Sequence, residues 1–133
     1  DTVVPRTQLV PVLERVYEIA REHDLSMLNV FHAGDGNLHP LVAFDAKQPG
    51  ERDRVIAAAR DMVVASIEAG GSLSGEHGIG LEKRDLMPLV FSELDLDAQA
   101  RIREAFDPRG VMNPGKVLPS GSRCFDAQGV RLA

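Results

Sequence analysis

A compact turn sequence between two short apolar runs constrains the fold of this chain more than any other feature. The segment Gly34-Asp35-Gly36-Asn37 separates residues 27–31 from residues 38–44. Glycine, aspartate and asparagine favour tight turns, and both flanking runs are short and rich in residues that favour strands. We therefore predict a β-hairpin, which requires an antiparallel sheet.

One helix is predicted before this hairpin and one after it. Apolar residues recur at helical spacing from Leu9 to Glu22, and Thr7 is a suitable N-cap. Residues 51–69 carry apolar side chains on one helical face, and Gly70-Gly71 ends the pattern.

After residue 80 the sequence predicts a more irregular, partly helical tail. Residues 81–91 are compatible with a helix despite Pro88, and Asp95 or Asp97 caps a further helix that ends at Phe106. The expected fold class is therefore α+β, with a small antiparallel sheet covered by helices on both faces and a helical C-terminal tail.

The hairpin register decides which side chains meet. If the turn is centred between Asp35 and Gly36, His32 lies directly opposite His39, with Cβ atoms about 4.5–5.5 Å apart. Two imidazoles at that separation can share one metal ion. A three-residue loop would break this pairing and weaken the case for a metal.

Glu76 and His77 could complete a site around the two histidines. Catalytic metal sites commonly use three protein ligands, and two histidines with one carboxylate form such a set. Glu76 is the natural carboxylate, and His77, which points the other way in an extended segment, is the best candidate base near neutral pH. Nearby glycines would let this backbone approach another element closely: Gly71, Gly75, Gly78 and Gly80.

Each of these residues also fits a structural role when it is taken alone. A single strand histidine more often hydrogen-bonds than binds metal, and Glu76 fits a solvated loop. Arg6 could hold a substrate carboxylate through its two-pronged donor geometry, although an exposed arginine needs no special reason. His23 and Cys124 are expected to be structural.

Composition narrows the classes of protein and partner. The net charge of −5, without a basic stripe, makes nucleic acid an unsuitable partner. One cysteine excludes a disulfide framework and a thiolate metal cluster, and it fits a reducing, cytoplasmic setting. We expect 133 residues to form one domain and, because no turn or cap signal precedes residues 3–5, a fragment of a larger protein.

Three motifs, at residues 29–40, 70–83 and 105–116, resemble the C-terminal domain of the FAD-linked oxidases, with the strongest likeness to the glycolate oxidase type. This family also includes D-lactate and D-2-hydroxyglutarate dehydrogenases. The resemblance implies a divalent metal, with zinc as first choice although manganese and iron accept such ligands, bound by His32, His39 and Glu76. It also implies that His77 is the base and that Asn113 and Lys116 lie near the flavin.

The same resemblance implies the fold and partners of a larger flavoprotein. Residues 1–133 would form a ferredoxin-like cap domain, incomplete in its sheet, while an N-terminal domain outside this chain binds most of the FAD. The substrate would be a small 2-hydroxyacid, an iron–sulfur subunit is a candidate partner, and an exposed sheet edge could pair copies into a homodimer.

Two other functions remain open from the residues alone. A metal-dependent hydrolase could use the same two histidines and glutamate to activate water, and it would act without flavin. A non-catalytic assembly domain could use these motifs only as turns, and it would bind no stoichiometric metal.

Overall fold

The computed structural model describes residues 1–119, which fall into two compact units that meet between Gly78 and Ile79. Cys124 lies outside the described residues. No helix in the described part of the chain is long and apolar enough to cross a membrane.

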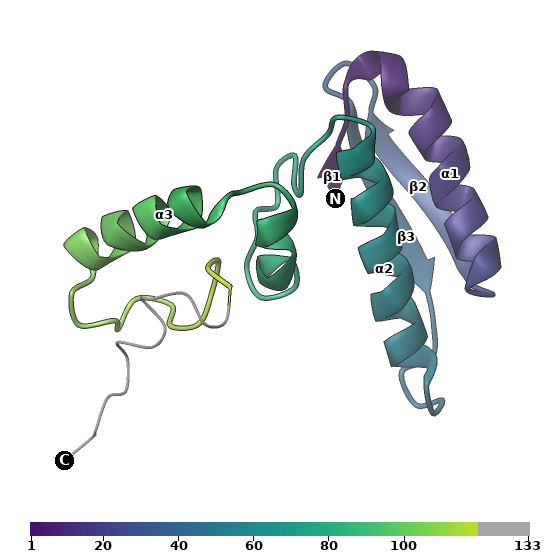
Figure 1. Cartoon of the computed structure of the whole chain (residues 1–133). Helices are drawn as coiled ribbons and strands as arrows, with labels where there is room; N and C mark the ends of the chain where they lie inside the picture. Colours follow the sequence, from purple (N-terminus) through teal and green to yellow (C-terminus); the bar gives the residue numbers. More distant parts are fainter. Residues whose placement is uncertain (120–133) are drawn as a thin grey trace. The chain divides into compact units, whose positions relative to one another are not determined.

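The first unit contains a small antiparallel sheet and two long helices (Figure 1). The strands lie in the order β1-β3-β2, and Ser72 adds an antiparallel bridge on the outer side of β1. This arrangement is that of a ferredoxin-like fold in which the fourth strand is reduced to one bridge, so the predicted α+β class is confirmed. The elements are β1 (Thr2–Val3), the 3-10 turn η1 (Arg6–Gln8), α1 (Leu9–Glu22), β2 (Ser26–His32), β3 (Asn37–Ala43) and α2 (Glu51–Glu68).

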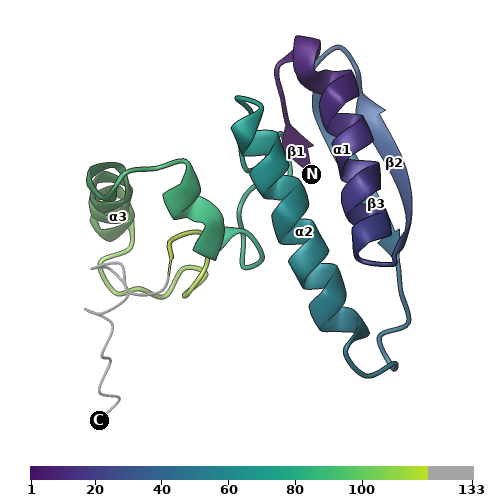
Figure 2. The ribbon, with the colours of Figure 1, turned by 45° about the vertical axis from the view of Figure 1, so that its right-hand side comes forward.

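The helices cover only one face of this sheet (Figure 2). Leu38 points to the helices and is fully buried, and it packs in one cluster with residues of α1 and α2 such as Val16 and Met62. On the opposite face Leu28, Val30 and Leu41 remain exposed by 71%, 54% and 52%. The expectation that both faces are buried is therefore wrong for the described residues.

The hairpin register differs from the predicted one by two residues. His32 pairs with Asn37 and Val30 pairs with His39, because the loop comprises residues 33–36 and is centred between Gly34 and Asp35. Backbone N–H groups of Asp35 and Gly36 both donate to the carbonyl of His32 and close this loop. A shift of two residues preserves the face of each side chain, so both histidines still point to the open face.

Pro40 lies in β3 where only one neighbouring strand is present. β1 pairs with Asn37 and Leu38 alone, so the other side of β3 is free of a strand at Pro40, as the missing N–H donor predicted. The strand β1 itself was not predicted, and its buried Thr2 accepts a 3.0 Å hydrogen bond from Ser66 of α2.

The start of α1 also differs from expectation. Its N-cap is Gln8, which makes no side-chain cap, and Thr7 belongs to the preceding η1 turn. Thr7 therefore does not cap α1, although the helix has the predicted limits.

The second unit contains η2 (Arg84–Leu89) and α3 (Glu93–Phe106). Within residues 81–91 only Arg84–Leu89 are helical, and they form a 3-10 helix that contains Pro88 rather than the expected α-helix. The N-cap of α3 is Ser92, whose side chain accepts from the N–H of Asp95 while the Asp95 carboxylate accepts from the N–H of Ser92. Asp95 therefore completes a capping box at the third helical position, and neither Asp95 nor Asp97 is the cap itself.

Candidate metal and acid–base site

Two histidines from neighbouring strands meet on the open face of the sheet. His32 ends β2 and His39 lies in the first half of β3, with ring centroids 5.4 Å apart and planes at 89°. They are diagonal neighbours rather than direct partners, because His39 pairs with Val30. Their approach near the turn follows from the strand pairing alone.

Glu76 reaches the same point from the loop that follows α2. Its Oε1 lies 3.1 Å from Nε2 of His39 and 3.9 Å from Nε2 of His32. One ligand atom from each of the three residues lies within 4.8 Å of the other two. The sequence-predicted set is therefore brought together in space.

The donor set and its spacing fit a divalent ion. Zinc binds histidine nitrogen and carboxylate oxygen at about 2.0–2.2 Å, so two ligand atoms of one tetrahedral ion lie about 3.3 Å apart. The His39 to Glu76 distance of 3.1 Å is close to this value, whereas Nε2 of the exposed His32 side chain lies 3.9 Å from Glu76. Three ligands of this kind leave a coordination position for a substrate.

Burial adjusts the protonation of His39. Its side chain is only 12% exposed, and this desolvation lowers the pKa of the imidazole, while the nearby Glu76 carboxylate opposes the shift. A lowered pKa keeps the ring neutral over a wider pH range. Neutral imidazole is the form that binds a metal ion.

His77 borders the three ligand atoms without belonging to the set. Its Nε2 lies 3.5 Å from Oε1 of Glu76, and its ring centroid is 4.9 Å from that of His39. The side chain is 61% exposed. The residue expected as the base therefore lies beside Glu76 and His39.

Two of the four glycines near Glu76 allow close backbone approach. A Cβ on Gly71 would collide with the carbonyl oxygen of Val3, and one on Gly75 would lie 2.5 Å from Oδ1 of Asn37. Gly78 and Gly80 instead adopt positive φ angles of 79° and 56°, and a Cβ there would meet nothing within 4 Å. These two glycines therefore serve backbone conformation, and the expected close approach does not apply to them.

Asn37 and Asp1 also contact this site but were not predicted. Asn37, expected only as a turn residue, is buried, and its Nδ2 lies 3.3 Å from Nε2 of His39. Its spacing of two residues from His39 on one strand could have indicated this shared face. The Asp1 carboxylate accepts a hydrogen bond from the backbone N–H of Glu76, and no local sequence pattern predicts that contact.

The weaker candidates lie elsewhere in the chain. Arg6 is exposed in η1, and within residues 1–119 no polar contact links its side chain to His32, His39 or Glu76. Asn113 and Lys116 belong to the second unit, where the ammonium group of Lys116 donates to Oδ1 of Asn113 at 3.2 Å. Arg103 holds this turn by donating to three of its carbonyl oxygens, those of Met112, Asn113 and Lys116.

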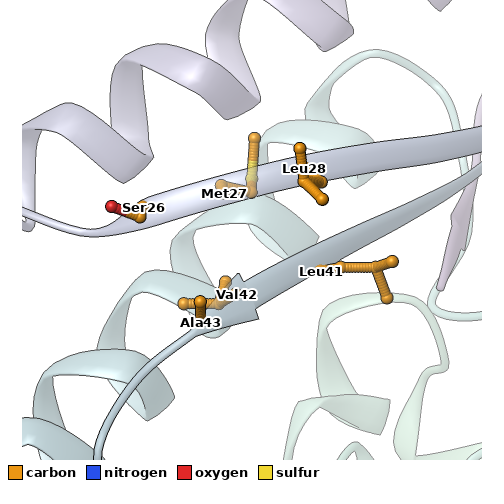
Figure 3. A pocket seen from close by; sticks show the side chains of 6 residues that line it. All are labelled: Ser26, Met27, Leu28, Leu41, Val42 and Ala43. Atoms are coloured by element: carbon orange, nitrogen blue, oxygen red, sulfur yellow. The ribbon is translucent and has the colours of Figure 1, made fainter.

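A hollow of about 270 Å³ lies at the other end of the hairpin, away from the turn (Figure 3). It is lined by Ser26, Met27, Leu28, Leu41, Val42 and Ala43. None of these side chains is titratable, so the hollow offers no acid or base. The histidine cluster remains the candidate site for chemistry.

Comparison with known proteins places the chain in a family. Residues 1–117 match the model of the FAD linked oxidases, C-terminal domain. Glycolate oxidase subunit GlcD of Escherichia coli (strain K12) is 44% identical over 95% of this chain and 25% of the relative. GlcD of Bacillus subtilis (strain 168) is 36% identical over 92% of this chain and 26% of the relative.

A third relative is named for a different activity. D-lactate dehydrogenase of Anaerostipes hadrus is 35% identical over 88% of this chain and 25% of the relative. The chain thus spans about a quarter of the length of the curated relatives it matches. The resemblance carried by the three motifs is confirmed, and this chain belongs to the FAD-linked oxidase family through its C-terminal domain.

Proposed function

We propose that this chain is the substrate and metal domain of an FAD-dependent 2-hydroxyacid oxidoreductase of the glycolate or D-lactate type. The observation that carries the proposal is the convergence of His32, His39 and Glu76 beside His77 on an open sheet face. Family membership and the names of the relatives support flavin-linked oxidation of such a substrate.

The positions of the residues support the following proposed roles. His32, His39 and Glu76 would hold a divalent ion, with zinc as first choice. That ion would bind the substrate's hydroxyl and carboxylate groups and lower the hydroxyl pKa, and the flavin would accept the hydride. His77 takes the hydroxyl proton at Nε2, the ring nitrogen that faces Glu76 at 3.5 Å. Buried Asn37 and partly buried His39 would keep one side of the site fixed.

The remaining assignments rest on chemical type and family pattern. Arg6 is proposed as a contact for the substrate carboxylate, and Asn113 and Lys116 as residues that face the flavin. FAD would be bound mainly by an N-terminal domain of the full-length protein. An iron–sulfur subunit is the proposed partner, because two relatives are named as glycolate oxidase subunits, and the cytoplasm is the proposed location.

Replacement of Glu76 tests the metal role in the full-length flavoprotein. We expect Glu76→Gln to lower both bound metal and 2-hydroxyacid turnover, because the neutral amide is a much weaker ligand for a divalent cation than the carboxylate. Elemental analysis and a steady-state assay over a panel of 2-hydroxyacids measure the two quantities. The matched control is Glu68→Gln at an exposed position near the end of α2, which should change neither. Full turnover by metal-free protein would exclude the metal role.

Replacement of His77 separates the base from the ligands. His77→Ala should slow flavin reduction strongly in stopped-flow measurements while metal content stays at the wild-type level. Loss of metal in this variant would instead make His77 a ligand. Hydrolytic activity without flavin would support the hydrolase alternative, which family membership does not favour.

A further inference from the structure

We propose that Asp1 is a positioning residue, whose buried carboxylate holds the loop that carries Glu76 and His77 in the geometry needed for metal binding and proton transfer. This inference rests on the proposed function of that site. Asp1 acts through the backbone of the loop, because its carboxylate accepts the N–H groups of Gly75 and Glu76.

The Asp1 carboxylate is surrounded by donors from one short segment. Its Oδ2 accepts hydrogen bonds from the backbone N–H groups of Gly75 at 2.7 Å, Glu76 at 2.8 Å and His77 at 3.4 Å. The hydroxyl of Ser74 lies 3.0 and 3.2 Å from the two carboxylate oxygens. Successive N–H groups that converge on one anion form a nest, and here the anion is a side chain of the same chain.

Ser74 closes the loop from its other side. Its hydroxyl oxygen accepts the N–H of Gly78 at 2.8 Å while its proton points to Asp1. The segment 74–78 therefore wraps around a single carboxylate. Because the Asp1 side chain is fully buried, water does not compete for these hydrogen bonds.

The position of Asp1 links this loop to the strand that carries His39. Thr2 and Val3, which follow Asp1, pair with Leu38 and Asn37 of β3. The carboxylate thus fixes the Glu76 backbone relative to the same strand that presents His39. Glu76 and His39 can then meet at 3.1 Å without relying on a flexible loop.

Asp1 also faces the proposed base. Its Oδ1 lies 3.6 Å from Nδ1 of His77, and the other ring nitrogen of His77 points to Glu76. This distance is too long for a hydrogen bond but short enough for a charge to orient the ring. One carboxylate therefore positions a ligand through its backbone and a base through its ring.

Zinc affinity of the full-length flavoprotein tests this role. Asp1→Asn keeps the size of the side chain but turns one acceptor into a donor that faces N–H groups. We expect zinc to bind about 10- to 100-fold more weakly, the range for groups that orient metal ligands. Competition with a chromophoric chelator measures the affinity, and Asp53→Asn, an exposed acid of α2, is the matched control.

Two further variants keep the test decisive if Asp1→Asn folds poorly. Ser74→Ala removes one donor and should weaken zinc binding in the same direction by a smaller factor. Asp1→Gly should leave an anion site that added formate fills, with partial recovery of zinc affinity. A purely structural role would lower the unfolding temperature of the metal-free protein and leave zinc affinity unchanged.

The outcomes also separate this inference from the proposed function. Absence of any stoichiometric divalent metal from the wild-type protein would overturn the metal site and this inference with it. Zinc binding that falls in Glu76→Gln but is unchanged in Asp1→Asn and Ser74→Ala would overturn the role of Asp1 alone.

Discussion

Gly75 lies where the Glu76 loop passes closest to β3, and its missing side chain is needed there. A Cβ would lie 2.5 Å from Oδ1 of Asn37, which is buried beside His39 and has little room to move. We expect Gly75→Ala to reduce the free energy of unfolding by about 1–3 kcal/mol, the usual cost of overpacking. Urea denaturation of the metal-free protein measures this loss.

Gly34 in the hairpin loop provides the matched control for this substitution. A Cβ there meets nothing within 4 Å, and neither Gly34 nor Gly75 has a positive φ angle. Both substitutions add the same methyl group, so a difference between them reports crowding alone. Equal stability of Gly75→Ala and Gly34→Ala would contradict the close approach to Asn37.

The site residues differ in how far sequence could predict them. His32 and His39 share a hairpin, and strand alternation places both on one face even though the assumed register was wrong by two residues. Glu76 could be selected only by its chemical type and its family motif. Asp1 could not be found, because its contact needs the pairing of a two-residue strand with β3, and two residues show no periodicity.

At the level of secondary structure, the hairpin turn was predicted less accurately than the helices. The sequence Gly34-Asp35-Gly36 is compatible with a turn centred on either side of Asp35, and in the structure Gly36 adopts a φ of 73° as the last residue of a four-residue loop. The long helices were predicted closely because many turns of helix repeat the same pattern. Their placement on one face of the sheet depends on tertiary packing, which apolar strand composition did not reveal.

Because the helices cover one face of the sheet, we expect unequal losses of stability when two leucines of β3 are truncated. Leu38 is fully buried under the helices, whereas Leu41 is 52% exposed on the open face. Leu38→Ala should reduce the free energy of unfolding by about 2–5 kcal/mol, as for other buried leucines, and Leu41→Ala by less than about 1 kcal/mol. Chemical denaturation of both variants measures the difference, and similar losses would show that the open face is covered.

At the level of the whole molecule, the chain combines an open apolar face with an unprotected sheet edge. Among the described residues β2 pairs only with β3, and its sequence from Ser26 to His32 contains no lysine and no proline. Such an edge is a template for pairing with another chain. Since the relatives are about four times as long as this chain, a protein of that length has further residues that can cover surfaces exposed in residues 1–119.

We therefore expect an isolated polypeptide of residues 1–133 to self-associate through the open face and edge of β2. Leu28 is the most informative position, because it is 71% exposed on this edge strand. Leu28→Lys places a charge on the open face and beside the edge of β2, and it should change the free energy of unfolding little. Sedimentation equilibrium over a range of concentrations should show dimers for the wild-type polypeptide and a several-fold weaker association for Leu28→Lys. The control Val10→Lys, at a position of α1 that is 62% exposed, should associate like the wild type. A monomer at every concentration, or equal effects of the two lysines, would show that β2 does not mediate association.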